Sequence, residues 1–194
     1  MTLSWPNAEL EYFADFIPSE EANRLYDELL NHTNWKGGTI QLFGKTHEIP
    51  RRECFYSTNG ESYSYSGRTL NVEQLPDYLT QLHERICIQA DHDFNAVLLN
   101  WYRDHRDSNG WHSDNEKELG TNPVIASFSL GATRIFQCKH SELGIKKNLE
   151  LTSGSLLIMK GEMQHHWKHQ IAKSTKEISG RINLTFRKIN NYSK

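Results

Sequence analysis

The segment NGWHSDNE, residues 109–116, places a histidine and an aspartate two positions apart. In an extended segment, side chains two apart point to the same side, so His112 and Asp114 could bind one metal ion together. They could equally be two solvated residues on a polar loop. The pair alone does not decide between these interpretations, and a metal site would need a third ligand.

The histidine-rich segment MQHHWKHQI, residues 163–171, offers three candidates for that ligand. If the segment is a strand, His165, Trp167 and His169 share one face and His166 points away. Two imidazoles and one carboxylate on one side of a metal form the facial triad of non-haem Fe(II) enzymes, which leaves positions open for a co-substrate and O₂. A lone histidine is more often structural, so the segments that follow must strengthen this hypothesis.

The segment GRINLTFR, residues 180–187, carries an arginine at each end of one strand face. It could be an edge strand whose polar side faces water. Alternatively, the polar face lines the interior of a barrel, where two guanidiniums would need an anionic ligand because burying an unpaired charge is costly. Arginine's planar fork suits a carboxylate. The polar residues of this face are Arg181, Asn183, Thr185 and Arg187.

The segment VLLNWY, residues 97–102, shows the same alternation, with Asn100 and Tyr102 on one face. These two side chains could supply hydrogen bonds from the same interior wall, and a half-buried strand with ordinary polar exposure fits as well. A Zn²⁺ hydrolase would also explain the metal ligands, but it would give Arg181 and Arg187 no role.

The elements that must position these residues are mostly short strands. From Phe94 onward, β-rich segments separated by turns predict a compact antiparallel sandwich or barrel. Before them, the pattern predicts a helix over 17–32, with Ser19 as N-cap, and a helix over 75–90, with Pro76 in its first turn. Between the helices, GGTIQLFGKTHEIPRR predicts two short strands around a Phe-Gly-Lys turn.

The bulk properties predict one mainly β (α+β) domain over residues 1–194, with helices and a hairpin to about residue 92 and the β core over about 93–190. Three cysteines far apart, with no C-x-x-C, favour reduced thiols, and neither a secretion signal nor an apolar run of membrane-spanning length is visible, so we expect a cytoplasmic location. The net charge of −2 means that nucleic acid could be bound only by local basic patches.

The order of these segments resembles the AlkB family of Fe(II)/2-oxoglutarate dioxygenases, and within it the nucleic-acid-repair branch that acts on duplexes. The resemblance extends from about Leu42 to Ile189 and rests on H-x-D, a histidine 57 positions after His112, the R-x-N-x-T-x-R strand and N-x-Y upstream. It also includes LFGKTHEIPR, YSYSG and GSLLIM, while RINLTFRKI is close to diagnostic.

The resemblance implies a double-stranded β-helix, a jelly-roll variant, with iron held by His112, Asp114 and His169. It implies 2-oxoglutarate as co-substrate, its keto-acid end on the iron and its far carboxylate on Arg181 and Arg187. Four further residues are expected to help hold the co-substrate: Asn100, Tyr102, Asn183 and Thr185. The implied reaction removes N-alkyl groups of the 1-methyladenine or 3-methylcytosine type from DNA, with RNA as a second candidate, and releases succinate, CO₂ and formaldehyde. His165 and His166 match no ligand and are expected to be structural or surface residues, and we expect a monomer.

The resemblance also implies nucleic-acid contacts, because a base in a duplex must be flipped out to reach a buried iron. Phe43 stands where relatives carry an apolar wedge, although a core phenylalanine near a turn is the alternative. Residues 63–67 resemble a lid over the flipped base, and Glu116 stands where relatives contact its exocyclic nitrogen; a solvated acid is the alternative there. The expected substrate contacts are Phe43, Tyr63, Tyr65, Ser66, Asn115 and Glu116.

Cations near the wedge and lid are expected to bind phosphates. They are Lys45, Arg51, Arg52 and Arg68, with Lys139, Lys146 and Lys147 as a second group. The chain departs from the family pattern at Asn115, where some duplex-acting relatives carry an acid, and at Ala172, where a proline is common. The first departure leaves base preference open. Two other functions also stay open: a catalytically silent nucleic-acid binder, and the same chemistry on tRNA, a protein or a lipid.

Overall fold

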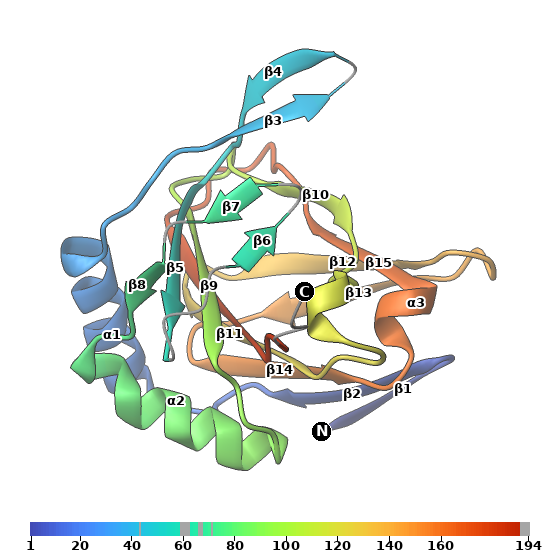
Figure 1. Ribbon diagram of the computed structural model, residues 1–194, viewed down its shortest axis with the longest axis horizontal. Helices are drawn as coiled ribbons and strands as arrows, with labels where there is room; N and C mark the ends of the chain where they lie inside the picture. The colour runs from blue at the N-terminus through green and yellow to red at the C-terminus, as the bar shows by residue number, and fades with distance from the viewer. Residues whose placement is uncertain (43, 59–62, 66–67, 71, 191–194) are drawn as a thin grey trace.

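The computed structural model describes the chain except for residues 43, 59–62, 66–67, 71 and 191–194. Two sheets dominate it (Figure 1). The larger has the strand order β1-β2-β14-β11-β16-β9-β5-β8, and all its neighbours are antiparallel except β5 and β8. In chain order its strands are β1 Thr2–Trp5, β2 Ala8–Phe13, β5 Arg52–Ser57, β8 Val72–Gln74, β9 Ala96–Tyr102, β11 Ile125–Gly131, β14 Ser155–Lys160 and β16 Arg181–Arg187.

The smaller sheet has the order β10-β15-β12-β13 and is antiparallel throughout. Two hairpins pair separately, β3 with β4 and β6 with β7. The bounds of these strands are β10 Asn109–His112, β12 Arg134–His140, β13 Lys146–Leu151, β15 Trp167–Ile171, β3 Thr39–Leu42, β4 Lys45–Glu48, β6 Tyr63–Tyr65 and β7 Arg68–Leu70. The predicted mainly β α+β class is therefore confirmed.

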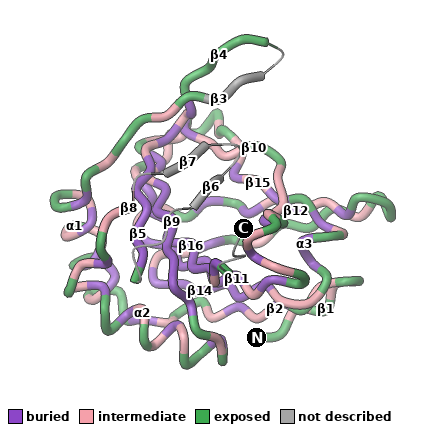
Figure 2. The backbone as a smooth tube through the Cα atoms, viewed as in Figure 1, coloured by how far each residue is buried: buried purple, intermediate pink, exposed green. Residues whose placement is uncertain are grey.

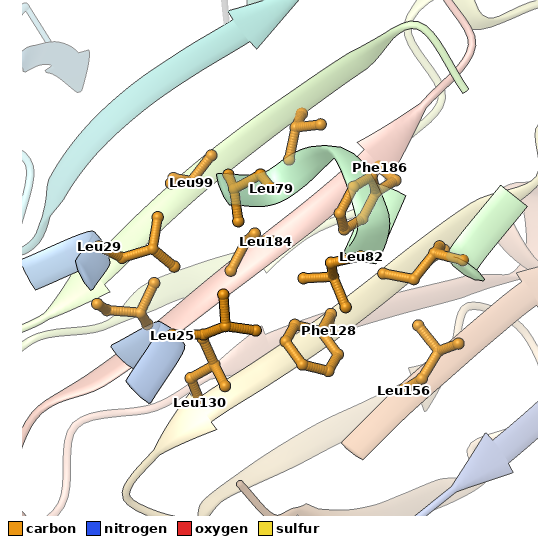
Figure 3. Packing of buried hydrophobic residues seen from close by; sticks show 14 of the residues in the cluster. Leu25, Leu29, Leu79, Leu82, Leu99, Phe128, Leu130, Leu156, Leu184 and Phe186 are labelled. Atoms are coloured by element: carbon orange, nitrogen blue, oxygen red, sulfur yellow. The ribbon is translucent and has the colours of Figure 1, made fainter. Parts of the chain in front are cut away.

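Alternation along the central strands builds two apolar cores, and the buried residues run through the middle of both sheets (Figure 2). On the outer face of the large sheet, Leu99 and Leu184 pack against Leu29 and Leu79 of two helices (Figure 3). On its inner face, strands of the large sheet pack against the smaller sheet, as with Leu157 and Trp167. The smaller sheet therefore lies over the face that carries the predicted polar residues.

The helices are α1 Ser19–His32, α2 Asp77–Ala90 and the single-turn α3 Met163–His166, with a short 3₁₀ turn, η1, at Lys117–Leu119. Both predicted amphipathic helices are present, but their caps were wrong. Pro18 rather than Ser19 is the N-cap of α1, and Pro76 is the N-cap of α2 rather than part of its first turn; neither cap makes a side-chain hydrogen bond. A proline is tolerated at the N-cap because the N–H that it lacks would have no intrahelical acceptor there.

The predicted strands around the Phe-Gly-Lys turn form the hairpin β3–β4, which extends away from the sheets (Figure 1). Its second strand is fully exposed. Phe43, at the turn, lies outside the described residues. Within the described part of the chain, no helix has the length and apolar character needed to cross a membrane.

Candidate metal centre and co-substrate pocket

Three side chains from the smaller sheet and the loop beside it converge on one point. His112 ends β10 and is paired in register with His169 of β15, while Asp114 follows two residues after His112. One ligand atom from each of His112, Asp114 and His169 lies within 4.8 Å of the other two, and no other such group of potential metal ligands occurs among the described residues. Adjacent strands thus bring together residues 57 positions apart, as the facial-triad hypothesis requires.

Hydrogen bonds from the protein orient two of these ligands. Nδ1 of His112 lies 2.7 Å from the carbonyl oxygen of Gly110, so this nitrogen carries the proton and Nε2 keeps its lone pair for a metal. The backbone N–H of Asp114 donates to Oε1 of Gln164 (2.9 Å), and Nη2 of Arg187 donates to Oδ1 (2.7 Å). The other carboxylate oxygen, Oδ2, faces Nε2 of His169 at 3.7 Å. One carboxylate oxygen is therefore anchored and the other is directed to the centre.

The site's electrostatics favour the protonation states that bind a metal. Burial lowers the pKa of His169 to about 3, helped by the neighbouring His112, and burial also lowers the pKa of His112. Burial alone would raise the pKa of Asp114, but the charge and hydrogen bond of Arg187, together with the neighbouring His169 and His112, outweigh it and hold that pKa at about 2. At neutral pH the two imidazoles are neutral and the carboxylate is charged, which is the donor set of a divalent iron site.

A pocket opens beside the triad between the two sheets. All six residues predicted to bind the co-substrate line it: Asn100, Tyr102, Arg181, Asn183, Thr185 and Arg187. They come from β9 and β16, whose pairing places Asn183 opposite Asn100 and Arg181 opposite Tyr102. Because β16 lies between β11 and β9, the edge-strand interpretation of GRINLTFR was wrong, and its polar face looks inward.

One end of this pocket carries a buried guanidinium and is suited to bind an anion. Arg181 is 1% exposed, and its Nη2 donates to Oγ of Ser129 at 2.9 Å. Its Nε and Nη1 have no hydrogen-bond partner in the part of the chain that the structure describes, and burial lowers its pKa to about 10. A buried guanidinium with two unused donors is costly unless a ligand satisfies it, and a carboxylate fits its geometry.

Comparisons with known proteins agree with this chemistry. The model of the 2OG-Fe(II) oxygenase superfamily matches residues 9–187. The chain is 36% identical over 180 residues to the Bos taurus DNA oxidative demethylase ALKBH2 and 36% identical over 186 residues to the Mus musculus alpha-ketoglutarate-dependent dioxygenase alkB homolog 3. The chain belongs to the AlkB family of Fe(II)/2-oxoglutarate-dependent dioxygenases.

The matches cover most of this chain but only part of those relatives. They include 87% and 91% of the chain, and 65% of the length of each of the two relatives. The solved structure of OsALKBH1 is similar in fold, with a TM-score of 0.66 at 16% identity, and the match covers 96% of this chain and all of that one. The two-sheet architecture is that of the family's double-stranded β-helix, and the His-Asp-His group is the family's facial triad for Fe(II).

In this AlkB-family site, the two arginines do not share one carboxylate. Arg181 and Arg187 are six residues apart on one strand, a separation of about 20 Å at 3.3 Å per residue. Arg187 contacts the metal ligand Asp114, whereas Arg181 lies at the far end of the pocket. The expectation that both hold the far carboxylate is therefore corrected, because the strand spaces them too widely.

Three further predicted co-substrate residues are engaged in hydrogen bonds with the protein. The amide nitrogen of Asn183 donates to Oγ of Ser127 and to the carbonyl oxygen of Phe128, and the hydroxyl of Thr185 donates to Oδ1 of Asn183. Oδ1 of Asn100 accepts from Nε of Arg51 at 2.7 Å. These bonds fix the pocket wall before any ligand binds.

Two other expectations were wrong. Arg51 is not a surface cation, because it is buried and paired with Glu53 at 2.7 Å as well as with Asn100. His165 is not on the strand face of His169, because it lies in α3 and contacts Oδ1 of Asn122 at the surface. His166 lies in the same turn, 3.6 Å from Glu162, so both histidines are away from the triad as the resemblance implied.

The predicted substrate contacts are described only in part. Asn115 is exposed and Glu116 half-buried, both just past Asp114. Tyr63 and Tyr65 are the first and last residues of β6, but the structure does not describe their side chains. Phe43 and Ser66 lie outside the described residues. Among the cations, Lys45, Lys146 and Lys147 are exposed, while Arg52 and Lys139 are half-buried. Arg68 begins β7, and its side chain is not described either.

The site also contains residues that the sequence did not reveal. Gln164, which fixes Asp114, lies on α3, and Ser127 and Ser129 of β11 bond Asn183 and Arg181. The two serines alternate with Ala126 and Phe128 along β11. This two-residue alternation could have predicted that both serines lie on one face of the strand, the face that carries the β16 arginines in the sheet.

Proposed function

We propose that this chain is an oxidative dealkylase of N-alkylated bases in DNA, with RNA as a second substrate. The observation that carries the proposal is the convergence of His112, Asp114 and His169 beside a pocket whose far end holds the buried Arg181. The relatives named DNA oxidative demethylase support the choice of substrate class.

Each residue has a distinct task in this proposal. Nε2 of His112, Oδ2 of Asp114 and Nε2 of His169 would hold the iron, which together with O₂ and 2-oxoglutarate would supply the oxidation that releases the alkyl group as an aldehyde. Arg181 binds the far carboxylate of the co-substrate, and Tyr102 packs beneath its guanidinium with a distance of 5.3 Å to the ring centre. Arg187 holds Asp114 in place.

The pocket wall opposite these polar groups is apolar and keeps bulk water away. Phe136 and Ile171 line it from the smaller sheet, Leu98 of β9 adds an apolar side chain to the polar wall, and all three are buried. No nucleophile or general acid is required from the protein, because the oxidised alkyl group leaves the base nitrogen without one. This agrees with a site whose ionisable groups are ligands and arginines.

The basic surface of the smaller sheet supports a nucleic-acid substrate. Lys168, Lys139 and Lys146 are directly opposite one another across β15, β12 and β13, so their side chains share one face. Lys139 also lies over the ring of Trp111, 4.4 Å from its centre, and Trp111 precedes the ligand His112. We infer that phosphates of the substrate strand follow this row, which replaces the expected contribution of Arg51.

Mass spectrometry of oligonucleotides carrying 1-methyladenine or 3-methylcytosine tests the proposal. With Fe(II), ascorbate and 2-oxoglutarate, we expect the loss of one methyl group with matching release of succinate, and neither with His169→Ala. A catalytically silent binder would release no succinate. Succinate release without methyl loss from any oligonucleotide would place the substrate in another class, such as tRNA, protein or lipid.

The same assay tests the hairpin β3–β4. Phe43→Ala is expected to slow repair of a duplex by roughly tenfold or more and to leave a single-stranded oligonucleotide nearly unaffected, because only a flipped base leaves a gap to fill. Thr46→Ala in the exposed strand β4 is the matched control. Equal repair of both substrates by Phe43→Ala would contradict the wedge.

A further inference from the structure

Another buried arginine, Arg134, lies behind the co-substrate pocket and does not line it. Arg134, the first residue of β12, is 2% exposed. Its guanidinium donates to three backbone carbonyl oxygens: those of Asp104 (3.2 Å), Asp107 (2.9 Å) and Ala172 (2.6 Å). It therefore joins the loop between β9 and β10 to the segment that follows β15, and no carboxylate contacts it within the described residues.

Arg134 and Arg181 share one aromatic ring. The guanidinium carbon of Arg134 is 5.6 Å from the centre of the Tyr102 ring, and that of Arg181 is 5.3 Å from it. Two positive charges are thus held within about 11 Å of each other in a buried region, where salt and water screen them less than at the surface. Burial lowers the pKa of both guanidiniums, and the charge of Arg134 contributes to the shift of Arg181.

The surrounding ions do not cancel this charge. Asp107 is held by Arg103 through its side chain and backbone, and Asp104 is paired with Arg106 at the surface. The three guanidiniums of Arg103, Arg106 and Arg134 therefore face two carboxylates in this cluster, which leaves one uncompensated guanidinium charge behind Tyr102. Arg181 adds a second on the pocket side.

We propose that Arg134 is a positioning residue that makes the far end of the pocket selective for a doubly charged co-substrate. It fixes the Tyr102 ring under Arg181. It also contributes a positive charge that attracts the far carboxylate of a ligand and has no effect on a ligand without one. The proposal rests on the proposed function, in which Arg181 binds that carboxylate. A role in holding the two loops alone would affect all ligands of the pocket equally.

The test compares two ligands that differ only at the far end: 2-oxoglutarate, and 2-oxopentanoate, the five-carbon 2-oxo acid without the second carboxylate. Calorimetric titration into Mn(II)-loaded protein without O₂ measures binding apart from turnover. For Arg134→Gln we expect 2-oxoglutarate to bind about 5- to 30-fold more weakly, the range for losing one charge at this distance in a partly screened site, with 2-oxopentanoate unchanged. Arg134→Lys keeps the charge and is expected to keep the preference within about threefold.

Arg106→Gln is the matched control, because it removes an equal charge from the same loop at an exposed position. Equal weakening of both acids by Arg134→Gln, or no change in either, would overturn the proposal. If Arg134→Gln does not fold, Arg134→Lys carries the test: a retained preference supports the role of charge, and a lost one overturns it. Arg181→Met distinguishes failure of the proposed role of Arg134 from failure of the proposed co-substrate site. If Arg181→Met bound 2-oxoglutarate as tightly as the unchanged protein, the co-substrate site itself would be refuted.

Discussion

Asp114 shows how much of a metal site is built by residues that never touch the metal. Its carboxylate is fixed by Arg187 from the large sheet, and its backbone N–H is fixed by Gln164 from the turn α3. Gln164 is 1% exposed, and its amide nitrogen also faces the sulfur of Met159, which lines the pocket. The ligand is thus held from two separate elements, as oriented metal ligands commonly are.

Gln164→Leu tests this arrangement at the scale of one residue. Leucine fills a similar volume but cannot accept the N–H of Asp114, so the ligand loses one restraint and its buried donor loses its partner. We expect the dissociation constant for Mn(II), measured by calorimetry, to rise about tenfold or more. Gln137→Leu, whose glutamine accepts a hydrogen bond from Gln170 and not from a metal ligand, is expected to leave Mn(II) binding unchanged. Unaltered Mn(II) affinity in a folded Gln164→Leu protein would contradict the assignment.

At the scale of elements, β16 serves the site and the core at once. Its odd-numbered residues line the pocket, and Ile182, Leu184 and Phe186 belong to the outer core under α1 and α2 (Figure 3). Leu184 is completely buried. A cavity created by truncating Leu184 would therefore lie directly behind the strand that carries both arginines.

We expect Leu184→Ala to lower the free energy of unfolding by about 2–5 kcal/mol, because a buried leucine leaves both lost transfer energy and a cavity. Ile88→Ala on α2 is the control, since Ile88 is 80% exposed and its truncation should change stability by less than about 0.5 kcal/mol. Urea denaturation of the protein measures both. Similar values for the two variants would show that the outer core is packed differently from Figure 3.

The sequence predicted the faces of these strands but not their neighbours. Alternation is local, so it correctly separated Asn100 and Tyr102 from Leu99 and placed the β16 arginines on one face. Whether β16 is central or at an edge depends on β9 and β11, which no local pattern encodes. For the same reason Arg51 looked like a hairpin cation, although Glu53 and Asn100 bury it.

One other error came from extending a pattern too far, and one residue of the site was missed because no local pattern marks it. The histidine-rich segment was read as one strand, but its first four residues form α3, and this displaces His165 from the face of His169. Gln164 gave no signal, because its partner Asp114 is 50 residues away in the chain. Non-local hydrogen bonds of this kind require the fold before they can be recognised.

At the scale of the whole molecule, the ligand-binding groups exist together only when both sheets are in place. The metal ligands come from β10, its following loop and β15, and the arginines come from β16 of the other sheet. An unfolded chain separates His112 from Arg181 by 69 positions and holds no such site. Metal and co-substrate should therefore bind the folded state almost exclusively and stabilise it by mass action.

A ligand at one hundred times its dissociation constant contributes about 2.7 kcal/mol, and in a chain of this length each kcal/mol raises the Tm by roughly 2–4 °C. We therefore expect Mn(II) with 2-oxoglutarate to raise the Tm by about 5–10 °C in a calorimetric scan, and EDTA to reverse the rise. His169→Ala removes a ligand and should abolish most of the shift. An equal shift in that variant would mean that the ions stabilise the protein elsewhere, and the triad would then not be the site that couples metal binding to folding.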